Sequence, residues 1–291
     1  MTDATLVDVP SAESTTRAVG DVRLHVVAAG DPEDPLVVLL HGFPDFWYGW
    51  RKQIGPLVDA GYRVLAPDMR GYNRSDAPTG VESYRTPRLA YDVKRLIETE
   101  GRDRAHVVGH DWGAFVAWDL ALRCPEVVDH LGIVNVPHPT VFRQTIRSSP
   151  RQMARSWYAA AFQVPWLPER LLGSRDGKLL ASMLEDSAAP GTFDHRDLSR
   201  YRASWREGSI TAMLDYYRAV ARYRDDPPRT EVAAPTLICW GEQDVALVPE
   251  MAERSRRLCA DGRLERFPET SHWVHLEESD RVTAALRAHL P

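Results

Sequence analysis

Short apolar runs alternate with longer amphipathic segments over most of the chain. The runs have the length of strands and are rich in β-branched residues, whereas the segments between them place apolar residues at helical spacing. This alternation predicts an α/β fold, in which a mostly parallel sheet carries helices on both faces. Strands are predicted at 22–28, 36–40, 62–66, 105–108, 127–136, 236–240 and 263–267. Helices are predicted at 47–60, 86–99, 112–123, 249–259 and 274–289.

The alternation stops in the segment 138–228. This segment has helical spacing, several prolines and no convincing strand, and its many aromatic residues need a surface to pack against. A helical insertion over the carboxyl ends of parallel strands forms a lid, and ligands bind in the crevice beneath it. We therefore predict a core domain of residues 1–137 and 229–291, with a helical cap of residues 138–228 inserted into it. The alternative is a loose surface excursion.

The composition fits a single large domain with an insertion. A chain of 291 residues can bury a sizeable core without cross-links, and its net charge of −5 gives no reason to expect a nucleic acid or an anionic membrane as partner. The three cysteines have neither paired nor metal-ligand spacing, which favours reduced thiols. Residues 1–20 lack the pattern of a secretory signal, and no apolar run reaches membrane-spanning length. A cytoplasmic monomer or homodimer is expected.

The sequence Gly-His-Asp-Trp-Gly at residues 109–113 directly follows one of the apolar runs. Glycines on either side of a central polar residue, between a strand and a helix, are typical of a nucleophile elbow. Here the central side chain is the carboxylate of Asp111, which is suited to displacement at saturated carbon and would leave an ester on the protein. Because no serine occupies the elbow, a serine esterase or peptidase is excluded. The alternative role, an acidic N-cap of the next helix, is chemically sound but ignores the flanking glycines.

A second motif, His-Gly-Phe-Pro at residues 41–44, follows the predicted strand 36–40. Gly42 lets the backbone approach a ligand closely, and we expect a cis peptide bond before Pro44. The N–H groups of Phe43 and Trp112 are predicted to form an oxyanion hole. The alternative is a simple turn at a strand end. The helix that begins at Trp112 also favours the ionised form of the neighbouring carboxylate.

Two further motifs complete the chain order of nucleophile, acid and histidine. Gly-Glu-Gln-Asp at 241–244 follows a predicted strand, and Asp244 is better placed than Glu242 to orient an imidazole. Ser-His-Trp at 271–273 follows the last predicted strand, so His272 is the predicted general base. His275, three residues on, is predicted to be structural.

Together these motifs resemble those of the α/β-hydrolase family, and most closely those of its soluble epoxide hydrolases. The similarity covers nearly the whole chain and is most specific at residues 41–51, at the elbow and at two tyrosines of the predicted cap. These are Tyr158 in Ser-Trp-Tyr-Ala-Ala-Ala-Phe-Gln and Tyr217 in Leu-Asp-Tyr-Tyr-Arg, where the adjacent Tyr216 is the alternative. Ser271 stands where a glycine is common in the family, and the turn should tolerate either residue.

The resemblance implies that the two cap tyrosines hold an epoxide oxygen over the aspartate. A phenol can donate to the alkoxide that an opening epoxide leaves, whereas a leaving halide needs no proton. Amphipathic packing is the alternative role for any single tyrosine. We also expect the substrate to contact His41, Pro44 and Trp112.

The predicted reaction is the hydrolysis of a small apolar epoxide to a vicinal diol through an ester on Asp111. No metal or organic cofactor is expected, because phenols and backbone N–H groups supply the electrophilic help. A haloalkane or haloacid dehalogenase is the closest alternative. Against it, Phe43 replaces the side-chain donor of many haloalkane dehalogenases, and Trp112 replaces the arginine typical of haloacetate enzymes. A ligand-binding protein that has lost turnover is a further alternative, but it has no need of an intact nucleophile, acid and base.

Overall fold

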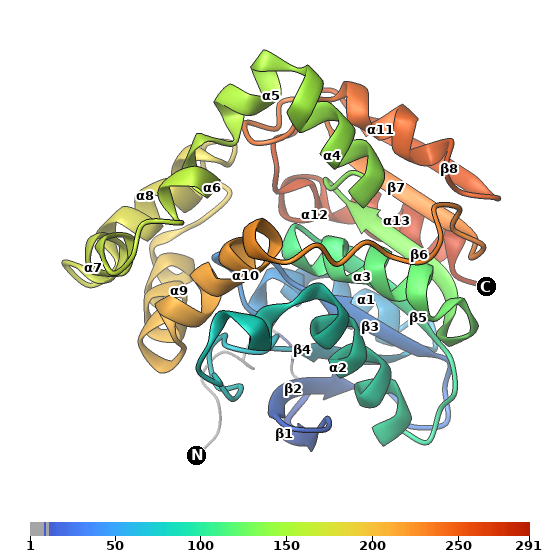
Figure 1. Ribbon diagram of the computed structural model, residues 1–291. Helices are drawn as coiled ribbons and strands as arrows, with labels where there is room; N and C mark the ends of the chain where they lie inside the picture. The colour runs from blue at the N-terminus through green and yellow to red at the C-terminus, as the bar shows by residue number, and fades with distance from the viewer. Residues whose placement is uncertain (1–8, 10–11) are drawn as a thin grey trace.

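The computed structural model describes residue 9 and residues 12–291. An eight-stranded sheet with the order β1-β2-β4-β3-β5-β6-β7-β8 forms its centre (Figure 1). β2 is antiparallel to both of its neighbours, and the other neighbouring pairs are parallel. The strands are β1 (Glu13–Ala18), β2 (Arg23–Ala29), β3 (Leu36–Leu40), β4 (Arg63–Pro67), β5 (Ala105–His110), β6 (Val128–Val134), β7 (Thr236–Gly241) and β8 (Gly262–Phe267).

Helices cover both faces of the sheet, with α2 and α3 in front and α1 and α13 behind in Figure 1. Every residue of β3, β4 and β5 is buried, which explains why these strands are mostly apolar rather than alternating between apolar and polar residues. The core helices are η2 (Trp47–Trp50), α1 (Arg51–Val58), η3 (Val81–Tyr84), α2 (Thr86–Thr99), α3 (Trp112–Arg123), η4 (Pro125–Val127), α11 (Glu250–Arg256), α12 (Val274–Glu277) and α13 (Ser279–His289). The predicted α/β-hydrolase architecture is confirmed.

The structure differs from the predicted elements in three places. β1 is an edge strand with the polar sequence Glu-Ser-Thr-Thr-Arg-Ala, so it carries no apolar pattern that could predict it. The single helix predicted at 47–60 is the 3₁₀ helix η2 followed by α1. The single helix predicted at 274–289 is divided at Glu278, whose φ of −118° and ψ of 48° are not helical.

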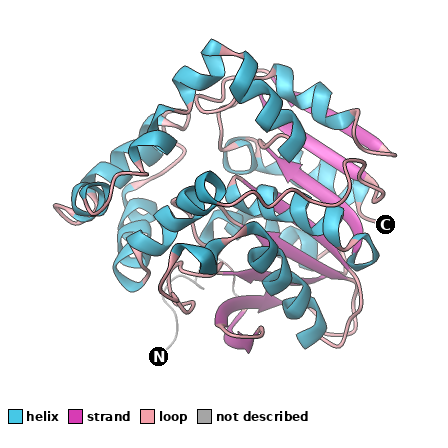
Figure 2. Ribbon diagram, viewed as in Figure 1, coloured by secondary structure: helices cyan, strands magenta, loops and turns pink. Residues whose placement is uncertain are grey.

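Residues 135–235, all of which the structure describes, contain helices and loops but no strand (Figure 2). They connect the neighbouring parallel strands β6 and β7. The helices are α4 (Pro139–Ser148), α5 (Pro150–Arg155), α6 (Trp157–Ala161), α7 (Leu167–Gly173), α8 (Lys178–Asp186), α9 (His195–Glu207) and α10 (Ile210–Arg222). We call this segment the helical insertion.

Polar contacts fix α9 of the helical insertion to the loop after β3. The indole N–H of Trp205 donates to the carbonyl oxygen of Pro44 at 2.6 Å, and the hydroxyl of Tyr201 donates to Asp45 at 2.9 Å. A capping box at Asp194 begins the helix. The insertion is therefore held against the loop that carries the His-Gly-Phe-Pro motif.

No helix in the described part of the chain is long and apolar enough to cross a membrane. The three cysteines, Cys124, Cys239 and Cys259, are free thiols.

Candidate active site

The turn between β5 and α3 holds Asp111 in an unusual backbone conformation, with φ of 49° and ψ of −122°. A side chain at Gly109 would lie 2.5 Å from the backbone of Gly113, and one at Gly113 would lie 2.2 Å from the carbonyl oxygen of Leu40. Only glycine fits at either position, because strand and helix approach each other too closely for a Cβ atom. The sharp turn expected of a nucleophile elbow is therefore present.

The loop after β3 approaches the Asp111 carboxylate directly. The N–H of Phe43 donates to Oδ1 at 2.6 Å, and a Cβ atom on Gly42 would lie 2.3 Å from the same oxygen. The peptide bond before Pro44 is cis, as expected. Asp111 stands at the N-cap position of α3, but its side chain makes no capping hydrogen bond, so the N-cap alternative does not describe it. Trp112 is the first residue of α3, and its N–H therefore has no acceptor within the helix.

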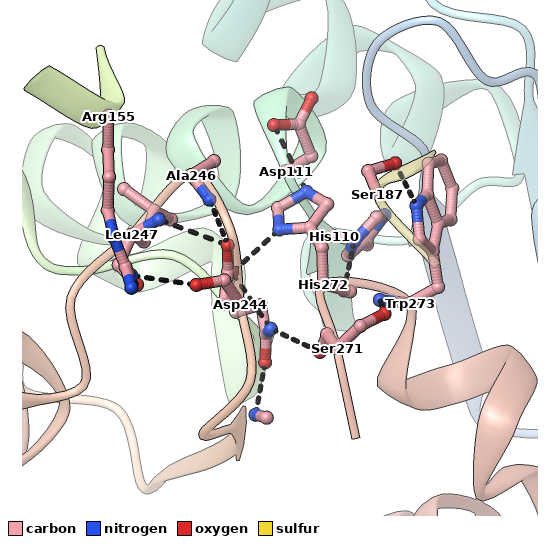
Figure 3. A network of polar contacts seen from close by, with 12 residues as sticks. His110, Asp111, Arg155, Ser187, Asp244, Ala246, Leu247, Ser271, His272 and Trp273 are labelled. Carbon is pink, nitrogen blue, oxygen red and sulfur yellow. Dashed lines mark hydrogen bonds and ion pairs between the residues drawn. The ribbon is translucent and has the colours of Figure 1, made fainter. Parts of the chain in front are cut away.

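His272 lies between two carboxylates (Figure 3). Its Nε2 is 3.5 Å from Oδ2 of Asp111, and its Nδ1 is 2.7 Å from Oδ2 of Asp244. The three residues that the sequence predicts as acid, imidazole and nucleophile thus lie together, beyond the ends of β7, β8 and β5. An Nδ1–H bonded to the carboxylate of Asp244 leaves Nε2 of His272 directed at Asp111.

Asp244 is itself held by groups that the sequence analysis missed. The side-chain N–H of Asn135 donates to its Oδ2 at 3.0 Å, and the backbone N–H groups of Ala246 and Leu247 donate to its Oδ1 at 2.7 and 3.0 Å (Figure 3). Asn135 also donates to the carbonyl oxygen of Ser271 and so links the acid to the histidine loop. Its sequence signal is a polar residue directly after the apolar run of β6, at a position with φ of 50°.

The two alternatives to the predicted acid and base lie elsewhere. The carboxylate of Glu242 pairs with Arg266 of β8, at 2.8 Å, on the exposed side of the sheet edge. His275 is fully buried, and neither of its ring nitrogens has a hydrogen-bond partner in the described structure. Neither side chain is in contact with Asp111.

The negative charges of Asp111 and Asp244 and the positive charge of His272 stabilise one another. Burial alone would raise the pKa of the Asp111 carboxyl, but the hydrogen bond and charge of His272 and the N–H of Phe43 place it below its usual value. Burial alone would lower the pKa of His272, but the charges and hydrogen bonds of Asp244 and Asp111 raise it to about 10. The two carboxylates therefore favour the imidazolium form of His272 in the free protein.

Tyr158 of α6 and Tyr217 of α10 line the same cavity as Asp111 and His272. Their rings are 5.9 Å apart and nearly perpendicular. Burial raises the pKa of both phenols above the usual range, so both remain protonated donors. Tyr216 points away, because its hydroxyl donates to the carbonyl oxygen of Arg70 at 2.7 Å.

The cavity has a volume of about 320 Å³ and lies between the sheet and the helical insertion. Apart from the groups described above, its wall is mostly apolar, with aromatic and aliphatic side chains from both parts of the chain. The apolar members are Trp112, Phe115, Val136, Pro137, Phe142, Ala159, Ala160, Val220, Ala221, Ala246 and Leu247. An apolar ligand with one polar, reactive end fits such a wall.

Two of the three residues expected to contact the substrate, His41 and Pro44, do not line the cavity. His41 is fully buried, and its Nε2 accepts a hydrogen bond from the Met69 N–H at 2.9 Å while its Nδ1 lies 2.9 Å from the Gly42 carbonyl oxygen. Pro44 contributes its carbonyl oxygen to Trp205. Neither residue belongs to the cavity wall, so both shape the loop instead; of the three expected contacts, only Trp112 lines the cavity.

Among the described residues, one buried group offers several ligand atoms to a cation. Asp45, His110 and His275 place one such atom each within 4.8 Å of the others. Oδ2 of Asp45, Nδ1 of His110 and both nitrogens of His275 have no hydrogen-bond partner in the described structure. A buried water with two to four polar partners would satisfy such atoms equally well.

Known proteins share this architecture. A model of the alpha/beta hydrolase fold matches residues 35–279. The AB hydrolase superfamily protein YfhM of Bacillus subtilis is 43% identical over 270 residues, covering 92% of this chain and 94% of that protein. Epoxide hydrolase 3 of Xenopus tropicalis is 38% identical over 277 residues, covering 91% of this chain and 74% of that protein.

Solved structures agree with these sequence relatives. A mutant epoxide hydrolase from Bacillus megaterium, in complex with its product (R)-3-[1]naphthyloxy-propane-1,2-diol, has a TM-score of 0.88 at 31% identity. The match covers 95% of this chain and 99% of that one. The chain therefore belongs to the α/β-hydrolase family, and within that family it is similar to epoxide hydrolases.

Proposed function

We propose that this protein converts epoxides and water to vicinal diols through a covalent ester on Asp111. The observation that carries the proposal is the set of groups around one carboxylate. The core supplies the imidazole of His272, at 3.5 Å, and the helical insertion supplies the phenols of Tyr158 and Tyr217 in the same cavity. A nucleophile, a base and two proton donors are the groups that ring opening and ester hydrolysis require. In this proposal, residues 138–228 act as a cap.

The first step forms the ester. The ionised carboxylate of Asp111 attacks a ring carbon, the carbon–oxygen bond breaks, and its electron pair stays on the oxygen. Because an alkoxide is a poor leaving group, Tyr158 and Tyr217 donate hydrogen bonds to it and one of them transfers its proton. The product is a neutral hydroxyalkyl ester.

The second step needs a neutral His272. Esterification removes the charge of Asp111, one of the two carboxylates that raise the pKa of this imidazole, so the pKa falls when the ester forms. The proton that His272 then loses can replace the one that a phenol gave to the alkoxide. The loss of the Asp111 charge in the first step therefore favours the neutral form of His272, which can act as the base in the second step.

Ester hydrolysis returns the protein to its starting state. Nε2 of His272 removes a proton from water, and the hydroxide adds to the carbonyl carbon of Asp111. The N–H groups of Phe43 and Trp112 stabilise the tetrahedral oxyanion. Its collapse releases the diol, whose oxygen takes the proton from His272. The new carboxyl group of Asp111 then passes its proton to His272, and the restored carboxylate contains one oxygen atom from water.

The similar proteins support the substrate class. Epoxide hydrolases at 36–38% identity and the Bacillus megaterium enzyme with its bound naphthyloxy diol are similar over most of the chain. A largely apolar cavity of about 320 Å³ suits a small epoxide with an aryl or alkyl substituent.

Single-turnover hydrolysis of an aryl epoxide in oxygen-18 water, with the protein in excess, tests the covalent step. Mass analysis should find one heavy oxygen in the Asp111 side chain of each protein molecule that has turned over once. In a His272→Gln variant the unlabelled ester should accumulate, because the first step does not need the base. A Glu242→Gln variant should turn over like the parent.

A label that appears only in the diol, with none in the Asp111 peptide, would contradict the covalent mechanism. Halide release from a matched halohydrocarbon that exceeds diol formation from the epoxide would instead indicate a dehalogenase.

A further inference from the structure

Most of the large apolar side chains exposed on this protein lie in one short segment of the helical insertion. Of the ten that are exposed among the described residues, seven fall between residues 153 and 179. Trp157 is 70% exposed and Trp166 is 63% exposed. We call the seven residues the cap patch; they are Met153, Trp157, Val164, Trp166, Leu167, Leu171 and Leu179. A cluster of this kind marks an interaction surface, because monomeric proteins rarely expose several large apolar side chains together.

The outer side of α6 consists of apolar residues. Trp157, Ala160 and Ala161 are all exposed and lie at the i, i+3 and i+4 positions of this short helix, and Val164, in the turn that follows it, is exposed as well. A helix on the surface of a protein normally turns polar residues outward on that face. Since the opposite side of α6 carries Tyr158 toward the cavity, the helix is apolar on both sides.

The cap patch continues into the mouth of the cavity. Ala160 belongs to the exposed face of α6 and also lines the cavity, and Val220 and Ala221 of α10 are likewise both exposed and part of the cavity wall. The exposed surface of the helical insertion and the cavity that holds Asp111 therefore share apolar residues. Figure 1 shows α7, at the far end of the patch, projecting away from the sheet.

Basic side chains outnumber acidic ones in the segment that carries most of the cap patch, although Arg151 pairs with Glu250 and Arg155 donates to the carbonyl oxygens of Asp244 and Leu247. Residues 147–179 contain six basic side chains and two carboxylates, although the whole chain has a net charge of −5. Both carboxylates are engaged, Glu169 with Arg218 at 2.7 Å and Asp176 with Arg206 at 2.6 Å. The basic residues are Arg147, Arg151, Arg155, Arg170, Arg175 and Lys178. The sequence analysis expected no anionic membrane as a partner, because the net charge of the whole chain is −5. That sum does not show the local excess of basic residues in this segment.

Two of these observations decide which partner fits. A second copy of the chain would bring one positive patch against another across a two-fold axis, and it would lie over the cavity mouth. An anionic lipid surface instead complements the charge, and exposed tryptophans beside Arg and Lys are typical of segments that bind in the lipid interface. We propose that the cap patch docks on anionic lipid surfaces and takes apolar substrate from them. Only the delivery of substrate rests on the proposed function.

Flotation with vesicles of phosphatidylcholine and phosphatidylglycerol at low salt measures the partition of the purified protein. The parent should float with these vesicles, and several-fold less with phosphatidylcholine alone or at high salt. A Trp157→Ala/Trp166→Ala variant should lower the partition coefficient by about tenfold or more. A second variant, Arg175→Glu/Lys178→Glu, should weaken binding to the anionic vesicles while keeping both tryptophans. Tyr91→Ala removes an exposed aromatic residue of α2 outside the patch and should change nothing.

Failure of the parent to float, or equal flotation of the parent and both patch variants, would overturn the proposal. A parent that is dimeric by light scattering and does not float, beside a monomeric tryptophan variant, would assign the patch to a second copy of the chain.

Hydrolysis of a short water-soluble epoxide without vesicles is measured in parallel. The tryptophan variant should match the parent in this assay and fall behind only with an epoxide dissolved in vesicles. A parent that floats but hydrolyses no epoxide would refute the proposed function and leave the docking surface standing.

Discussion

At the scale of single residues, Asp111 combines a left-handed backbone with a carboxylate that is only one-fifth exposed. Such a conformation costs on the order of 1–3 kcal/mol and persists only where the surroundings determine it. Here Gly42, Gly109 and Gly113 leave room for no other arrangement, and the N–H of Phe43 fixes the direction of the carboxylate. The strain keeps the side chain in the cavity and away from the helix end that it could otherwise cap.

The neighbouring tyrosines of α10 provide a matched test of the proton donors. Tyr158→Phe and Tyr217→Phe should each slow ester formation by about 10²-fold or more, because the alkoxide loses a hydrogen-bond donor. Tyr216→Phe should leave that rate unchanged and lower the free energy of unfolding by about 1 kcal/mol, through the lost bond to Arg70. Stopped-flow measurement of the ester and urea titration provide the two values. Equal rate losses in Tyr216→Phe and Tyr217→Phe would refute the assignment.

At the scale of elements, the junction of β5 and α3 depends on contact between backbones. Gly113→Ala places a Cβ atom 2.2 Å from the Leu40 carbonyl oxygen, so α3 has to move away from β3. We expect a loss of roughly 1–3 kcal/mol in the free energy of unfolding, together with a slower first step because Asp111 and the Trp112 N–H shift with the helix.

Gly55 of α1 is the matched control, because a Cβ atom there meets nothing within 4 Å beyond its chain neighbours and the backbone of its own helix. Gly55→Ala should change the free energy of unfolding by less than about 1 kcal/mol, because the helix preference of alanine is opposed by the contact of its Cβ atom with the ring of Pro56, and should leave activity unchanged. Urea titrations of both variants measure the effects. A Gly113→Ala protein as stable and active as the parent would show that the close approach is not required.

Periodicity predicted seven of the eight strands, and six of these, β2 to β7, are apolar on at least one face, whereas β8 has Leu264 and Phe267 on opposite faces. β1 was missed because an exposed edge strand carries no such pattern, and its position follows only from pairing with β2. The helix ends at Trp50 and Glu278 were missed because local packing, not propensity, sets them.

Sequence motifs predicted the site residues Asp111, Asp244 and His272. They did not predict Asn135, because this residue holds Asp244 through contacts between segments far apart in the sequence. For the same reason, only the structure separates the orientations of Tyr216 and Tyr217.

At the scale of the whole molecule, several buried histidines have to stay neutral for the fold to persist. Burial lowers the pKa of His106 and of His138 to about 4. Between pH 4 and about 6.5 these two imidazoles therefore bind protons in the unfolded chain but not in the folded one, so their contribution to the free energy of unfolding falls as the pH falls. Asp45, Asp92 and Asp119, whose pKa burial raises to about 7, 6 and 6, contribute with the opposite sign. His272 adds nothing to this slope, because with a pKa raised to about 10 it is protonated in both states over the same window.

His138 offers a direct test of this linkage. Its Nδ1 accepts the Thr140 N–H and caps α4, a role that asparagine can take over without titrating. His138→Asn should be less stable at neutral pH, because the ring packs against Trp118. Between pH 6.5 and 4, however, its free energy of unfolding should fall less than that of the parent, by up to roughly 1.4 kcal/mol for each pH unit. Urea titrations across this range measure the two slopes.

His195→Asn is the control, since His195 is exposed in the folded chain as in the unfolded one. Parallel pH curves for His138→Asn and the parent would show that His138 takes up its proton in the folded state as readily as in the unfolded chain.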